Sequence, residues 1–185
     1  MKVFRIRLDS NVFQSFLPDN EHIWATDSLM MNCQPKLQLW NPPSVHIGNP
    51  TLKKGNFFHL CSGAFVVDAV AAGALRTILE WAGELLPLPH ESSLYHLINV
   101  LECANCLDDD KTKWVFGKTS GARLRIKEYH FHPSRLTESS LFKIHETAMG
   151  EVLTVSGMKD PEDEFKSVVE QQKLEGILFE EIWSD

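Results

Sequence analysis

Bulky apolar and polar residues alternate along much of the chain, and this period of two predicts β-strands. Residues 3–8 alternate apolar side chains with Arg5 and Arg7, so one face of this opening strand is expected in a core and the other in water. Residues 85–88 are interrupted by Pro87, which fits only an edge strand. Further strands are predicted at residues 94–107, 114–116, 124–132, 141–145, 152–155 and 177–182.

Two other stretches have the spacing of an amphipathic helix. The first begins at Asp68, whose carboxylate suits an N-cap, and ends before Gly83. Its apolar positions, which we expect to lie on a sheet, are Val70, Ala74, Leu75, Ile78, Leu79 and Ala82. The second opens at Asp160 and Pro161, the order of a cap followed by a first-turn proline. Its inward-facing positions are Phe165, Val168, Val169 and Gln172.

The order of these elements predicts an α+β domain with a mostly antiparallel, twisted sheet and about two main helices packed on it. We expect a single domain over residues 1–185, in which residues 1–64 form a variable part and residues 65–185 a regular core. The variable part is rich in proline and asparagine, which favours short strands and loops. Its Trp24 and Trp40 either pack inward or help to form a recognition surface.

Charge and composition narrow the classes of partner. The net charge is -7 and there is no Lys/Arg-rich block, which argues against nucleic acid and favours a basic protein partner. The first residues lack the apolar run of a signal peptide, and no apolar run approaches the roughly 20 residues that span a bilayer. We therefore expect a cytoplasmic protein without membrane contact.

Four cysteines would be reduced thiols in that compartment: Cys33, Cys61, Cys103 and Cys106. Cys103 and Cys106 have the Cys-x-x-Cys spacing of redox and zinc sites. A redox pair needs its first thiol at a helix N-terminus, whereas this pair ends a predicted strand and runs into three aspartates. A small apolar role in a strand is the favoured interpretation, and no cofactor is expected.

One short segment is the sharpest enzymatic candidate. On a regular strand, Glu128, His130 and His132 would share one face and could converge on a metal ion. A bulge near Lys127 would instead bury the alternate aromatic residues and leave the histidines facing solvent. A His-x-His pair without further spaced ligands is a weak metal pattern, so we expect no metal and no catalytic residue here.

Acidic groups are the features most compatible with partner binding. They are Asp108, Asp109 and Asp110 in one run, and Glu180 and Glu181 near the C-terminus. Such carboxylates would attract a basic partner over a long range and speed its encounter with the chain. The alternative is that they are solvated turns with no partner.

An ordered series of short motifs completes the pattern. The pieces are Tyr95-His96-Leu97-Ile98-Asn99-Val100, Leu107-Asp108, Leu141-Phe142, Leu153-Thr154-Val155-Ser156 and Gly176 to Phe179. In this order they resemble immunity family eleven of bacterial polymorphic toxin systems, over roughly residues 65–182. Each piece alone is common in β-strands, so the series carries the resemblance.

The resemblance implies a cytoplasmic immunity protein that binds and neutralises a cognate toxin domain, and it implies no catalytic residues. Two alternatives come from other classes. One is a metal-dependent enzyme built on Glu128, His130 and His132, and the other is an adaptor or structural binding protein. Since the motif pieces are expected in the core, we predict that recognition lies in loops, in acidic rims or in residues 1–64.

Overall fold

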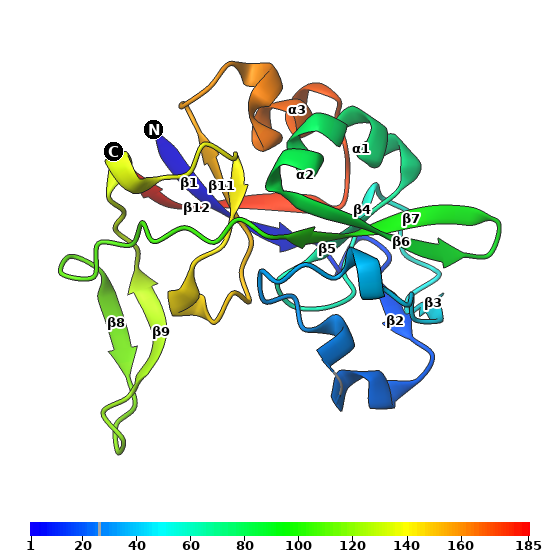
Figure 1. The fold of residues 1–185 in the computed structure, drawn as a ribbon, viewed down its shortest axis with the longest axis horizontal. Coiled ribbons are helices and arrows are strands. Elements are labelled where there is room, and N and C mark those ends of the chain that lie inside the picture. Colours follow the sequence, from blue (N-terminus) through cyan, green and yellow to red (C-terminus); the bar gives the residue numbers. More distant parts are fainter. Residues whose placement is uncertain (26) are drawn as a thin grey trace.

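The computed structural model describes residues 1–25 and 27–185, with side chains for all of these except Trp24 and Ala25. Two four-stranded antiparallel sheets form its centre, with helices along one side (Figure 1). The terminal sheet has the order β10 (Leu141–Phe142), β11 (Leu153–Ser156), β1 (Lys2–Leu8), β12 (Ile177–Ser184). The central sheet has the order β4 (Phe57–Phe58), β5 (Phe65–Val67), β7 (Ser93–Val100), β6 (Gly83–His90). The predicted α+β class with a mostly antiparallel sheet is confirmed.

The remaining strands form two antiparallel pairs. They are β2 (Phe16–Pro18) with β3 (Val45–Ile47), and β8 (Lys113–Phe116) with β9 (Arg123–Glu128). The helices are α1 (Ala69–Ala74), α2 (Arg76–Ala82) and α3 (Phe165–Gln171). Short 3-10 turns lie at Glu21–Ala25, Asp27–Leu29, Leu37–Leu39, Pro133–Arg135, His145–Thr147 and Pro161–Asp163. In Figure 1 the β8–β9 hairpin projects from the body of the molecule on the side away from the helices.

The core follows the alternation seen along the strands. On β1, Phe4 and Ile6 are buried while Arg5 and Arg7 lie on the other face, as the pattern predicts. Leu79 and Phe165 of the helices pack over the Ile6 side. Phe57 and Phe65 of the central sheet and Leu141 of the terminal sheet belong to the same cluster. Removing such side chains from water contributes about 1.5–3 kcal/mol each before conformational entropy is subtracted. Residues 1–64 supply β1 to the terminal sheet and β4 to the central sheet.

The helix predicted from Asp68 is divided. Asp68 caps it as expected, since its Oδ1 accepts the N–H of Ala71 at 2.8 Å. At Leu75 the backbone leaves helical geometry, with φ -106° and ψ 7°, and a second helix follows. The break lets α1 bury Ala71 and α2 bury Leu79, whereas Val70 is 63% exposed. The prediction of one helix with Val70 and Ala74 facing inward is therefore wrong, whereas Leu75, Ile78, Leu79 and Ala82 are buried as predicted.

The strand predicted over residues 94–107 ends early, at Val100. Beyond it, the N–H groups of Leu101 and Glu102 donate to the carbonyl of Ala82. The N–H of Ala104 then donates to the carbonyl of Lys143. The chain thus leaves the central sheet and crosses to residues that follow β10, because its backbone partner changes at this point. Most apolar residues of the segment are buried on both sides of the crossing, although Leu94 is 50% exposed, and this made the sequence pattern look continuous.

The second predicted helix begins later than expected. Asp160 makes no side-chain cap hydrogen bond, and Pro161 starts a 3-10 turn instead. The carboxylate of Glu164 accepts the backbone N–H groups of residues 157–159, which shapes this turn and delays the α-helix until Phe165. Phe165, Val168 and Val169 are buried as predicted, but Gln172 is exposed.

Candidate partner-binding groove

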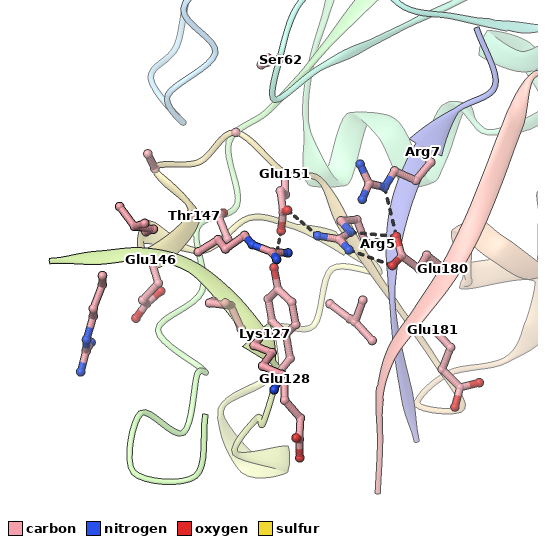
Figure 2. Close-up of a pocket in the computed structure, with 18 residues that line it drawn as sticks. Arg5, Arg7, Ser62, Lys127, Glu128, Glu146, Thr147, Glu151, Glu180 and Glu181 are labelled. Atoms are coloured by element: carbon pink, nitrogen blue, oxygen red, sulfur yellow. Dashed lines mark hydrogen bonds and ion pairs between the residues drawn. The ribbon is translucent and has the colours of Figure 1, made fainter. Parts of the chain in front are cut away.

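An open groove of about 930 Å³ lies between the β8–β9 hairpin and the face of the terminal sheet opposite the helices. Figure 2 shows that its walls come from three places: β9, the outer face of β1 and β12, and the loop that precedes β11. Its charged lining residues are Arg5, Arg7, Arg123, Arg125, Lys127, Glu128, Glu146, Glu151, Glu180 and Glu181. Both signs of charge are present, so the groove is not a site for one simple ion.

Arg5 is the centre of the groove's floor. The antiparallel register places it opposite Glu180, and its Nη2 contacts Glu180 Oε1 at 2.9 Å. Its Nη1 contacts Glu151 Oε1 at 2.7 Å, and the hydroxyl of Tyr129 donates to the other oxygen of Glu151 at 2.7 Å. Arg7, two residues along the same face, contacts Glu180 at 3.1 Å (Figure 2). A strand, its neighbour and a loop are joined here by charge-assisted hydrogen bonds.

The ionisation of this network is fixed. Burial opposes the charge on Arg5, but the hydrogen bonds to Glu180 and Glu151 outweigh it and raise its pKa. The hydrogen bond from Arg5 lowers the pKa of Glu180. Burial and the bond to Glu151 raise the pKa of Tyr129, so its hydroxyl keeps its proton and remains a donor. These directions keep Arg5 positive, Glu180 negative and Tyr129 neutral near neutral pH, and the network acts as a brace.

The two rims of the groove differ in charge. Along β9, Arg123, Arg125 and Lys127 are exposed at alternate positions. Arg125 and Lys127 have no ion-pair partner among the residues that the structure describes. On β12, Glu180 and Glu181 have side chains that are 46% and 42% exposed. Within the described residues, the carboxylate of Glu181 has one ion-pair partner, the exposed Lys2 at 2.7 Å, and it points away from the Arg5 network (Figure 2).

The run of three aspartates is only partly available. Asp108 is 5% exposed, and Lys111 lowers the pKa of its carboxylate through hydrogen bonds from the side chain and backbone. Asp109 binds the guanidinium of Arg123 through two contacts of 2.8 and 2.7 Å, which lower its pKa. Arg123 in turn stacks on Trp114, 4.5 Å from its ring centroid. Two of the three carboxylates therefore hold the turn and the hairpin, and Asp110 is exposed.

The residues considered for a metal site do not converge. Glu128 contacts His130 at 3.2 Å and Lys113 at 2.7 Å, while His132 faces Asp108 at 3.8 Å. The predicted bulge is present, because Lys113 pairs with Glu128 and Trp114 with Ile126, leaving Lys127 unpaired. Tyr129 and Phe131 are buried after it, as the alternative expected. Within residues 1–25 and 27–185, no three His, Cys, Asp or Glu side chains gather as metal ligands would.

The other candidates lie away from the groove. Cys106 is fully buried and Cys103 partly buried, and neither is in a disulfide. Trp40 is half-buried and its Nε1 donates to the carbonyl of Pro87 at 2.7 Å, beside Leu39, which is 93% exposed. The prediction for Trp24 lies outside the described side chains. Trp40 is thus hydrogen-bonded and half-buried, which is compatible with both roles that the sequence allowed, inward packing and a recognition surface.

The sequence did not identify Glu151 and Tyr129 as residues of a candidate site. It placed Arg5 only on the solvent-facing side of a strand. The alternation along residues 3–8 signalled that Arg5 points away from the core, but nothing local identified its partners. No protein-family model matches the chain, and no curated protein matches it. None of the helices in the described residues has the length and apolar character that crossing a bilayer requires.

Proposed function

We propose that this chain is an immunity protein that acts in the cytoplasm by binding a cognate bacterial toxin domain in a stoichiometric complex. The ordered motif series supports the family, and its pieces lie largely in buried strands, including β7 and β11. Such positions maintain the fold and leave the surface free to differ between partners. The mechanism that fits is occlusion of the toxin, with no chemical step by this chain.

The observation that carries the proposal is the composition of the groove between β9 and β12. Its floor is a fully paired network around Arg5, which resembles a rigid support more than a reaction centre. Its β12 rim has Glu180, which is half-exposed although Arg5 and Arg7 bind it, and Glu181, which pairs with the exposed Lys2. A rigid, pre-organised surface lowers the entropy cost of association, and exposed carboxylates steer a basic partner toward it.

The groove also sets the kind of surface that would fit. A convex element of the toxin would enter between the hairpin and the terminal sheet, with basic side chains toward Glu180 and Glu181. Acidic side chains of the same element would meet Arg125 and Lys127 on the β9 rim. Charges of both signs across one interface favour one partner and one register over others.

The decisive experiment is titration of toxin activity with the purified protein. The toxin to use is the one encoded by the neighbouring upstream gene, and co-expression of the two should restore growth. We expect full protection at one equivalent and a complex that survives gel filtration. Protection at a small fraction of an equivalent would contradict occlusion, because it would require turnover.

A charge-reversal pair locates the interface. Glu181→Lys should weaken toxin binding by roughly tenfold or more, because it replaces attraction by repulsion at the β12 rim. Glu162→Lys is the matched control, since Glu162 is an exposed carboxylate in the 3-10 turn before α3 and does not line the groove. Equal binding by both variants and the wild type would remove the β12 rim from the interface.

A further inference from the structure

The β8–β9 hairpin differs in charge from the rest of the chain. Residues 111–127 carry six of the 18 lysine and arginine residues and none of the 25 aspartate and glutamate residues. The net charge of -7 conceals this basic segment. Its cations are spread along the sequence, but the pairing of β8 with β9 brings them onto one projecting arm (Figure 1). They are Lys111, Lys113, Lys118, Arg123, Arg125 and Lys127.

Three of these six cations are open to a ligand. The other three are held in ion pairs of 2.7–2.9 Å with Asp108, Glu128 and Asp109. Lys118, Arg125 and Lys127 are exposed and have no ion-pair partner within residues 1–25 and 27–185. An anion would therefore bind these three without first breaking a contact inside the protein.

The arm is held in a defined shape. The N–H of Gly117 donates to the carbonyl of Ala122 at 2.8 Å, and the N–H of Gly121 donates to the carbonyl of Gly117 at 2.9 Å. Gly121 has φ 64°, a conformation that glycine adopts without strain. Arg123 stacks on Trp114 of the facing strand. An isolated two-stranded hairpin is marginally stable, so these contacts are what keep its cations in place.

An exposed aromatic ring lies among the cations. Phe116, the last residue of β8, is 53% exposed, and the register places it opposite Arg123. Arg125 and Lys127 are two residues apart on β9, which in an extended strand is roughly 6.6 Å. Single-stranded nucleic acid binds to surfaces of this kind, with its phosphates on the cations and its bases stacked on the ring. An acidic peptide would use the cations alone.

We propose that the β8–β9 hairpin binds single-stranded RNA or DNA without reading its sequence. Lys118, Arg125 and Lys127 contact phosphates, and Phe116 stacks on a base. The acidic remainder of the chain repels the same polyanion, which confines binding to the arm. The site does not depend on the proposed function. Because the proposed toxin contact also uses Arg125 and Lys127, toxin and nucleic acid would compete.

Fluorescence anisotropy of the purified chain alone with labelled oligouridylate and oligodeoxythymidylate tests the site. Strands of about 16 nucleotides cover one site of this type. We expect a dissociation constant of roughly 1–100 μM at physiological salt. The logarithm of the association constant should fall with the logarithm of salt concentration with a slope of about -2, since three cations displace counterions. No binding of either strand at low salt would overturn the proposal.

Two variants separate charge from stacking. Arg125→Gln/Lys127→Gln should weaken binding by roughly tenfold and bring the salt slope to about -0.7, because one open cation remains. Phe116→Ala should weaken binding by about fivefold or more and leave the slope unchanged, because it removes a ring and no charge. Wild-type affinity in both variants would remove the hairpin from the site.

Lys173→Gln is the matched control for Lys127→Gln. Lys173 is also exposed and has no ion-pair partner in the part of the chain that the structure describes, but it follows α3. Lys173→Gln should bind like the wild type, whereas Lys127→Gln should bind more weakly. Equal losses in the two would show that only net charge matters and would overturn the proposal.

Two competitors distinguish the classes of partner. Polyglutamate of the same length carries charge without bases, and a DNA duplex of the same length keeps its bases stacked inside. We expect both to displace the labelled strand less well than an unlabelled single strand. Polyglutamate that competes equally would assign the arm to an acidic protein, and a duplex that binds more tightly would contradict stacking on Phe116.

Discussion

Arg5 and Glu151 form a 2.7 Å ion pair that joins the first strand of the chain to the loop before β11. Their side chains are 17% and 26% exposed, so the pair is shielded more than an ordinary surface contact. Because Tyr129 and Glu180 complete the same network, the hairpin side and the β12 side of the groove are held at a fixed separation. The rigidity of the proposed binding surface rests on this pair.

The network predicts different costs for two arginines on one strand face. Arg5→Met should lower the free energy of unfolding by about 2–3 kcal/mol, because it leaves two carboxylates without their shielded partner. Arg7→Met should cost about 1 kcal/mol or less, since Arg7 is 56% exposed. Urea denaturation at neutral pH measures both. Equal costs would show that the shielding of Arg5 has no energetic consequence.

Glu164 predicts a pH-dependent contribution to stability. Burial opposes its charge, but hydrogen bonds from residues 156–159 outweigh this and lower its pKa from the ordinary 4.5. Its stabilisation is therefore complete above about pH 4.5 and is lost as the pH falls through the lower folded pKa. Glu164→Gln should cost about 1–3 kcal/mol at pH 7, and the difference from wild type should shrink in acid.

The exposed neighbour Glu162 supplies the control for that series. Glu162→Gln should change the free energy of unfolding by no more than about 0.5 kcal/mol at either pH. Denaturant titrations of the three proteins at pH 7 and below pH 4.5 give the comparison. A Glu164→Gln difference that stays constant across this range would mean that the charge of Glu164 does not matter.

The burial of Leu79 predicts how much the second part of the divided helix contributes to the free energy of unfolding. Its side chain has no solvent exposure, so Leu79→Ala should cost about 2–5 kcal/mol through lost burial and a cavity. Val70→Ala on the preceding helix should cost almost nothing, because Val70 is 63% exposed and alanine favours a helix. Thermal denaturation of the two variants distinguishes them, and a large loss at Val70 would contradict the observed break at Leu75.

The contacts of Arg123 predict what stabilises the β8–β9 hairpin. Its guanidinium binds Asp109 with two contacts and stacks on Trp114, a combination that lysine cannot reproduce. Arg123→Lys should speed amide hydrogen exchange in β8 and β9, with little change in β1 and β12. Arg125→Lys is the matched control, because Arg125 has no ion-pair partner in the described part of the chain. Unchanged exchange in both variants would show that the hairpin does not need this clamp.

Local patterning predicted most of the elements and the buried faces of several. The alternation of residues 3–8 predicted β1 and its solvent-facing side. The proline at residue 87 predicted an edge strand, which is β6. The aromatic residues at 129 and 131 pointed to the bulge at Lys127. These features depend on neighbours within a few residues, so a sequence contains them directly. The resemblance to an immunity family stays a prediction.

The sequence by itself determined the α+β class, the buried strands and the acidic balance, because periodicity, turn residues and charge are local or additive properties. Only the tertiary structure decided that the strand from residue 94 stops at Val100, where its hydrogen-bond partner changes. It alone brought Arg5 to Glu151 and Arg123 to Asp109. Such pairs are set by how distant segments pack, and no pattern within a short window specifies which segments will meet.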